Sequence, residues 1–199
     1  LAGGRLVGSA PLARVGGLLL AGSLLGFAVV LARRIAATRV ESGPMLRRYA
    51  VVAVALAGWS VAAGVAWLAD PLAPDATLGP SWAVHLLALG VVGFVLLGTL
   101  YHVVPFLVWV ERYSDRIGLE AVPTVDDLYD GRAAAVDLAA TLVGSSLLVL
   151  AGTLSLPPLV TVGGGALVTL GVLVFCANLA LVVGRHAGRV RDLLVPVVA

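Results

Sequence analysis

The chain alternates long apolar runs with short polar segments. The apolar runs cover about residues 15–32, 49–69, 81–111, 133–154 and 159–184, and each is bounded by arginine, acidic residues, glycine or proline. At about 1.5 Å per residue, a helix of about 20 residues matches the ~30 Å hydrocarbon core of a bilayer. The pattern therefore predicts an all-α membrane bundle with five transmembrane helices. Residues 1–14 are rich in glycine and are predicted to form a loop.

The composition agrees with a membrane protein. Hydrophobic residues make up 60% of the chain and charged residues 12%, whereas a soluble globular domain carries about 25% charged residues. We expect a single membrane-embedded domain over residues 1–199. Because the sequence begins with Leu1 rather than methionine, it is compatible with a longer chain that has earlier helices. It contains no nucleotide-binding glycine loop and no nucleophile–base–acid pattern.

The 13 basic residues are all arginine, and their distribution predicts the orientation. Eleven of them follow the first, third or fifth apolar run, and only Arg5 and Arg14 precede the first run. Because arginine is enriched in cytoplasmic loops, the N-terminus is predicted outside and the C-terminus in the cytoplasm of a prokaryotic cytoplasmic membrane. The arginines do not form the basic stripe of a nucleic-acid-binding protein, so lipid and other membrane subunits are the expected partners. The basic and then apolar tail, residues 185–199, is expected to lie along the membrane surface.

Two features of the apolar runs predict local geometry. Gly22 and Gly26 are four residues apart, the spacing at which two helix backbones approach closely, so they predict a packing face on the first helix. Pro105 lies inside the third run and lacks a backbone N–H, so it predicts a kink or break near residues 101–104.

Several polar residues inside or beside the runs predict contacts rather than chemistry. Thr124 with Asp127 is typical of a helix N-cap. Asp137 is predicted to lie at the membrane interface and to pair with an arginine, with a buried proton relay as the alternative. Asn178 predicts a hydrogen bond between two helices. Cys176 is the single cysteine, so the chain has neither a disulfide framework nor a zinc-binding cysteine pattern.

The third apolar run holds the best candidates for a site, His85 and His102. A histidine in a membrane span is rare and often functional, although an interhelical hydrogen bond is the structural alternative for both. The two lie 17 residues apart, which places them about 100° out of register and about 25 Å apart along a helix. They therefore cannot face one cofactor. His186, among the arginines of the tail, is expected to be a solvated interface residue.

The run from His85 to Gly90, followed by Gly98-Thr-Leu-Tyr101-His-Val-Val-Pro105, resembles the haem-ligand helix of subunit I of haem-copper oxidases, in particular the cbb3 type. The longer phrase TLYHVVPFLVWVERYSDRIG is similar to a group of bacterial membrane proteins related to that subunit. The resemblance covers about residues 81–125. It implies that His85 is the axial ligand of a low-spin haem iron, with Tyr101 and His102 as secondary candidates.

The chain also departs from that family. The oxidase helix carries His-x-His, and the first of these positions is Ala83 here. The histidine pair and the His-Pro-Glu-Val-Tyr-like run that hold copper are absent, so no copper site is evident and the lone chain is not expected to be catalytic.

Four hypotheses follow from these observations. The first is a haem-binding or accessory subunit of a respiratory or electron-transfer complex, in which a partner or a missing N-terminal part supplies the second axial ligand. The second is a structural membrane subunit without a cofactor. The third is a b-type cytochrome anchor, although two bis-histidine haems would need four histidines and the chain has three. The fourth is a transporter, which only Pro105 and Asn178 favour.

Overall fold

The computed structural model describes residues 1–39 and 43–186, so the predicted surface position of the last 13 residues of the tail, 187–199, lies outside the described part. Five of its helical segments are long and apolar enough to cross a membrane, which confirms the predicted number of spans. Four are single α-helices: α2 (Ala10–Ala37), α3 (Pro44–Ala69), α5 (Gly131–Leu154) and α6 (Pro158–His186). The third span joins the 3-10 helix η1 (Ser81–Ala83), the π-helix η2 (Leu86–Gly93), α4 (Phe94–Tyr113) and the 3-10 helix η3 (Ser114–Arg116).

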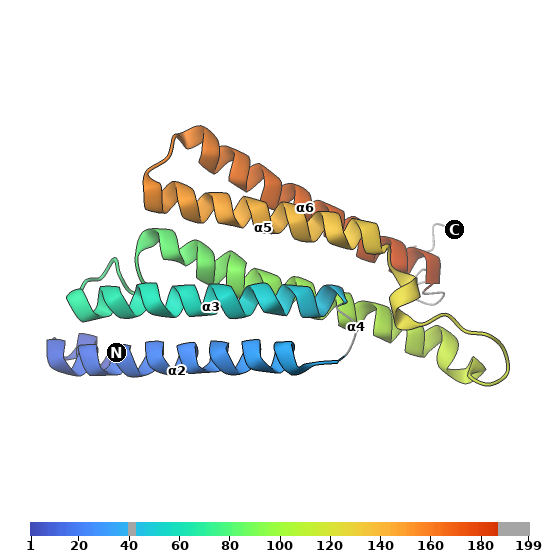
Figure 1. The fold of residues 1–199 in the computed structure, drawn as a ribbon, viewed down its shortest axis with the longest axis horizontal. Coiled ribbons are helices and arrows are strands. Elements are labelled where there is room, and N and C mark those ends of the chain that lie inside the picture. Colours follow the sequence, from blue (N-terminus) through green and yellow to red (C-terminus); the bar gives the residue numbers. More distant parts are fainter. Residues whose placement is uncertain (40–42, 187–199) are drawn as a thin grey trace, which may run out of the picture.

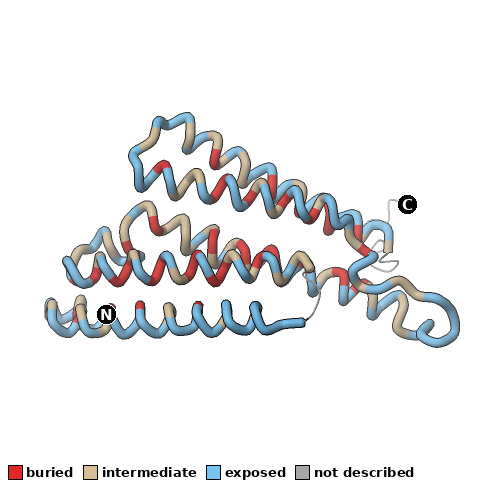
Figure 2. The backbone as a smooth tube through the Cα atoms, in the orientation of Figure 1, coloured by how far each residue is buried: buried red, intermediate tan, exposed pale blue. Residues whose placement is uncertain are grey.

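The spans form two groups that lie side by side (Figure 1). Helix α2 packs on α3, and α3 packs on the third span; α5 and α6 form a close antiparallel pair that meets the third span on its other side. Helix α3 is the most buried span, with half of its most apolar segment inside the bundle against 17% for α2. Figure 2 accordingly shows buried positions along α3 and a mostly exposed α2. Exposed apolar side chains such as Leu19 and Val54 are the expected surface of a bundle surrounded by lipid.

Small residues do bring α2 and α3 together, but they are not the predicted pair. A Cβ atom added to Gly17 would lie 3.1 Å from the Trp67 Cβ, and one added to Gly64 would lie 3.2 Å from the Ala21 Cβ. Gly22 and Gly26 have open space around them. Within the described chain the predicted packing face of Gly22 and Gly26 is therefore wrong, because the contact face of α2 is the one that carries Gly17 and Ala21.

The prediction of a loop over residues 1–14 is also wrong. Residues Ala2–Leu6 form a short helix, α1, and α2 already begins at Ala10 with a proline in its first turn, where the missing N–H is tolerated. Arg5 of α1 donates hydrogen bonds to the carbonyl oxygen of Pro71 at 2.9 Å and to the Thr77 hydroxyl at 2.7 Å. These contacts fasten α1 to the connection between α3 and the third span.

Pro105 does not break the third span. Helix α4 continues through Pro105, which is buried within it, and the departure from α-helical geometry is the π-helix Leu86–Gly93 nearer the start of the span. Gly90 allows this segment to approach α3, because a Cβ atom there would lie 2.6 Å from the Ala55 Cβ. Short π-helical segments occur often at functional sites.

Candidate functional site

His85, the main candidate from the sequence, directly precedes the π-helix and is half-buried. Its position is set by the connection between α3 and the third span. The indole N–H groups of Trp59 and Trp67, both on α3, donate to the carbonyl oxygens of Leu78 at 2.9 Å and Ala76 at 2.8 Å. These bonds hold the connection against α3. The start of the third span is consequently fixed between α3 and α5 (Figure 1).

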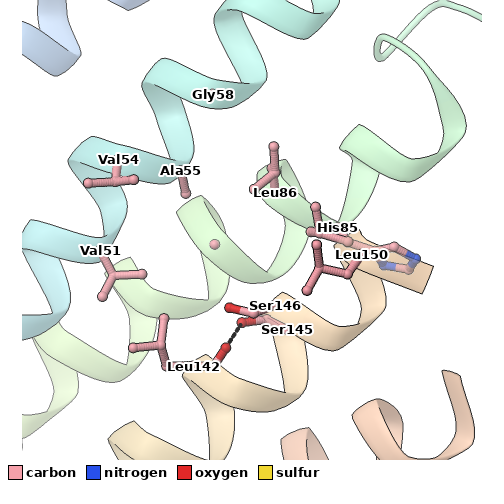
Figure 3. A pocket seen from close by; sticks show the side chains of 12 residues that line it. Val51, Val54, Ala55, Gly58, His85, Leu86, Leu142, Ser145, Ser146 and Leu150 are labelled. Atoms are coloured by element: carbon pink, nitrogen blue, oxygen red, sulfur yellow. Dashed lines mark hydrogen bonds between the residues drawn. The ribbon is translucent and has the colours of Figure 1, made fainter. Parts of the chain in front are cut away.

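His85 lines a pocket between α3, the start of the third span and α5, with a volume of about 380 Å³. It lies at one end of the pocket beside Leu150, and Val51 and Leu142 lie at the other end (Figure 3). The distance from Leu142 to Leu150 along α5 is about 12 Å, at 1.5 Å per residue. The walls are almost entirely aliphatic, and Ser145 and Ser146 are the only polar side chains besides His85. Pockets of a few hundred Å³ with this character hold small molecules and cofactors.

Haem is the cofactor that the sequence resemblance implies, and the pocket meets two of its requirements. The His85 imidazole is a suitable axial ligand for haem iron, and it has no hydrogen-bond partner among residues 1–39 and 43–186. The aliphatic walls suit an apolar macrocycle. No basic side chain lines the pocket, so acidic substituents of the cofactor would have to reach its open side. The lining thus supplies one possible axial ligand and apolar walls, but no partner for the acidic groups of haem.

The other two histidines lie away from this pocket. His102 is exposed on α4, and its ring stacks on that of Phe106, with 6.1 Å between the centroids. The Nδ1 atom of His186, at the end of α6, lies 3.0 Å from the Tyr113 hydroxyl oxygen. His186 is also half-buried, so it is hydrogen-bonded rather than fully solvated. In the described part of the chain, no three histidine, cysteine or acidic side chains come together in a way that could hold a metal ion.

A second polar site lies at the opposite end of the bundle, where α3 and α5 begin. Arg48 and Asp137 form an ion pair with both side chains fully buried. The Tyr101 hydroxyl donates to the other oxygen of the Asp137 carboxylate, and the Asn178 amide donates to the Tyr101 oxygen at 3.0 Å. We refer to these four residues as the Arg48 cluster. It joins α3, α4, α5 and α6, one residue from each helix.

Additional contacts of Arg48 give its buried guanidinium further hydrogen-bond and ring partners within the Arg48 cluster and the helices around it. The Arg48 guanidinium also donates to the carbonyl oxygens of Pro44 and Ala134, and it lies over the Tyr101 ring at 4.5 Å from its centroid. Arg48 Nε is the one buried atom of the cluster without a partner in the described part. Positive and negative charges cancel within the cluster, and each charge is hydrogen-bonded. Such an arrangement fixes the relative positions of helices, because an unpaired charge would be costly in the membrane.

Sequence reasoning found parts of this cluster. The predicted interhelical hydrogen bond of Asn178 is confirmed, and Asp137 does pair with an arginine. The Asp137 side chain is fully buried inside the bundle, and its position at the membrane interface stays a prediction. Tyr101, a secondary haem candidate from the sequence, belongs to this cluster instead. The sequence does not identify Arg48, a charged residue in the first turns of α3, as the arginine that pairs with Asp137.

The polar segment between the third and fourth spans caps the same end of the bundle. Thr124 and Asp127 form the predicted N-cap arrangement, on the 3-10 helix η4 (Val125–Leu128). The hydroxyl and backbone N–H of Thr124 hold the pKa of the Asp127 carboxyl below its ordinary value. Asp130 caps α5, and the N–H groups of Ala133 and Arg132 lower its pKa in the same way. Burial, and a hydrogen bond to Asp126, raise the pKa of Tyr129. The aspartates of this segment thus serve as caps and hydrogen-bond acceptors.

Comparison of the chain with protein-family models, with curated proteins and with solved structures finds no match.

Proposed function

We propose that this protein is a subunit of a membrane electron-transfer complex, related to subunit I of haem-copper oxidases, and that it binds haem through His85. The observation that carries the proposal is the position of His85 at the end of an apolar pocket inside a bundle of five apolar helices. The π-helix that directly follows His85 adds to it, since such segments are common at functional sites.

The roles of the chain's residues follow from the pocket. His85 would hold the iron through one ring nitrogen, and the aliphatic side chains of α3 and α5 would exclude water and lower the local dielectric constant. When bound, haem supplies a one-electron redox centre. The close packing of Gly90 on Ala55 fixes the segment that carries His85, which keeps the ligand in one orientation.

The proposal includes the orientation in the membrane. With eleven arginines on one side, the N-terminus lies outside and the C-terminus in the cytoplasm of a prokaryotic cell. His85 would then be near the outer face, four residues into the third span, and the Arg48 cluster near the cytoplasmic face. Electrons would enter or leave the pocket from the outer half of the membrane.

An absorption spectrum tests the haem proposal. The complex should be purified with its native partners from cells supplied with haem, and a Soret band is expected. Replacing His85 with alanine should remove or weaken that band, because an apolar side chain cannot replace the iron–imidazole bond. His102→Ala is the matched control: the same substitution on the same span, outside the pocket, should leave the spectrum unchanged. A colourless preparation of the unmodified complex would refute the haem proposal.

A cofactor-free structural subunit is the second candidate, and the Arg48 cluster favours it. Four helices tied by buried polar contacts make a rigid scaffold on which other subunits could assemble. On this alternative His85→Ala would change neither colour nor partner content of the complex. The same purification therefore distinguishes the two candidates.

A further inference from the structure

Another apolar cavity lies away from the His85 pocket, in a groove between α2 and α3. It has a volume of about 450 Å³, and no polar side chain among the described residues lines it. Six of its nine lining residues are alanine: Ala28, Ala32, Ala36, Ala50, Ala53 and Ala57. The groove stays open because alanine side chains are too short to fill the space between the two helices. We refer to it as the α2–α3 groove.

The α2–α3 groove has the depth of one membrane leaflet. It extends along α2 from Ala36, next to the end of the helix, to Ala28, a distance of about 12 Å at about 1.5 Å per residue. Half of a ~30 Å hydrocarbon core is about 15 Å. Beyond Ala28 the helices close on each other, because a Cβ atom added to Gly64 would lie 3.2 Å from the Ala21 Cβ. These limits suit the acyl chain of one lipid, whereas a transmembrane helix of a partner would continue across both leaflets.

Two arginines flank the α2–α3 groove near the end of α2. Arg33 is four residues after Val29 and three before Ala36, and both of these line the groove. Residues three or four apart are neighbours on a helix surface, so Arg33 lies beside the groove. On α3, Arg47 precedes the lining residue Ala50 by three residues and is placed beside the groove in the same way. Positive charge is therefore present at one end of an otherwise apolar site.

This charge is not balanced by acidic side chains of the described part. Arg33, and Arg39 in the connection that follows α2, are exposed, and neither forms an ion pair with another described residue. Residues 33–48 include five arginines and a single acidic residue, Glu41, which lies outside the described part. Guanidinium groups form strong, paired hydrogen bonds with phosphate. Basic sites between transmembrane helices accordingly bind the head groups of anionic lipids.

We infer that the α2–α3 groove binds one anionic phospholipid. An acyl chain lies along the alanine-lined groove, and the phosphate group contacts Arg33 and Arg39, with Arg47 adding to the positive charge. A zwitterionic phospholipid has the same chains, but it brings a cationic group of its own next to the arginines, so it binds more weakly. The inference involves neither His85 nor a cofactor, and it therefore does not depend on the proposed function.

Native mass spectrometry tests this inference by counting the lipids that stay on the protein. The full chain should be purified in mild detergent with its bound partners and titrated with phosphatidylglycerol or phosphatidylcholine that carry identical acyl chains. One arginine near a lipid surface contributes ~1 kcal/mol, a factor of about five in affinity. The first phosphatidylglycerol should therefore bind about fivefold or more tightly than the first phosphatidylcholine.

Paired variants locate the site. Arg33→Ala should weaken binding of the first phosphatidylglycerol about fivefold. Arg34→Ala is the matched control, because Arg34 is equally exposed but none of the residues three or four positions from it lines the groove. Ala32→Leu should weaken binding by filling the groove, whereas Ala37→Leu, outside the lining, should not. All four residues are exposed, so circular dichroism should show unchanged helix content in each variant.

Four outcomes would overturn the inference. Equal losses in Arg33→Ala and Arg34→Ala would indicate a general attraction of the basic end of α2 to lipid. Equal affinities for the two lipids would remove the role of charge. Displacement of phosphatidylglycerol by glycerol phosphate, which has no acyl chain, would indicate a phosphate site without the groove. Binding that appears only after partner subunits are removed would mean that a partner helix occupies the groove. A colourless complex with the expected lipid selectivity would refute the haem proposal and support this inference.

Discussion

Removing the Asp137 carboxylate should destabilise the bundle strongly. The Asp137→Ala substitution leaves the Arg48 guanidinium fully buried without its counter-ion and leaves the Tyr101 hydroxyl without its acceptor. Breaking a buried ion pair by deleting one partner costs about 3–5 kcal/mol. Arg48 keeps two backbone carbonyl acceptors, Pro44 and Ala134, which offset part of the loss. We therefore expect a decrease of about 3 kcal/mol in the free energy of unfolding, the lower end of that range.

The double substitution Arg48→Met/Asp137→Leu distinguishes two causes of destabilisation. One is the loss of the attraction between Arg48 and Asp137, and the other is the burial of the Arg48 charge without a counter-ion. Replacing both members of a buried pair with apolar residues of similar size is often neutral or stabilising. Arg48 Nε already lacks a partner in the described part, so its removal relieves one unsatisfied group. The double variant should therefore be more stable than Asp137→Ala. The exposed pair Arg116–Glu120, with 3.0 Å between Nη1 and Oε1, is the control, and Arg116→Ala should cost only about 0.3–0.5 kcal/mol.

Reversible unfolding in mixed detergent micelles, followed by circular dichroism at increasing fractions of denaturing detergent, measures these differences. A loss below about 1 kcal/mol for Asp137→Ala would refute the reasoning, because that value is typical of an exposed pair. A double variant less stable than Asp137→Ala would also contradict it. Both variants lack the ion pair, so that result would mean that the unpaired Arg48 charge is not the main cost.

Two further predictions concern topology and helix packing. In a Cys176→Ser background, a cysteine replacing Asp75 should react with an impermeant thiol reagent on intact cells and one replacing Glu120 should not; the reverse pattern would invert the proposed orientation. Gly171→Ala should destabilise the α5–α6 pair by about 1–3 kcal/mol, because its Cβ atom would lie 2.3 Å from the Thr141 hydroxyl oxygen. Gly163→Ala on the same helix meets nothing within 4 Å and should not destabilise, as unfolding measurements of the two variants would show.

The spans were predictable because the length of an apolar run and its flanking breakers depend on local sequence. The prediction that the second span ends at Ala69 is confirmed: α3 ends there, and Asp70-Pro71 follows. Starts were less accurate, since α2 begins at Ala10 rather than Val15 and α3 at Pro44 rather than Tyr49. Both helices have a proline in the first turn, where its missing N–H is tolerated.

The contact faces were not predictable in the same way. Apolar residues surround each span, so hydrophobicity does not distinguish the lipid side from the protein side of a helix. The sequence does not distinguish Gly17 from Gly22 as a contact residue, because only the position of Trp67 on α3 shows that Gly17 faces that helix. Similarly, Arg47 and Arg48 are adjacent in the sequence, and only the fold shows which of them meets Asp137.

The His85 pocket and the Arg48 cluster are connected through α5. Asp137, Thr141 and Ser145 follow one another at intervals of four residues on this helix, and all three are buried, so one face of α5 runs from the cluster to the pocket. At the cluster, α3 and α5 meet through the Arg48–Asp137 pair. Toward the His85 end, the start of the third span lies between them (Figure 1), and the pocket forms beside it.

The shape of the pocket therefore depends on a contact that lies outside it. Asp137→Ala would release α5 from α3 at one end, and under the proposed function it would lower haem content although Asp137 does not line the pocket. A spectral change in that variant would accordingly carry no information about ligation. The comparison of His85→Ala with His102→Ala avoids this difficulty, because neither histidine donates or accepts a hydrogen bond in the Arg48 cluster. A difference between these two variants is therefore best explained by the position of His85 in the pocket.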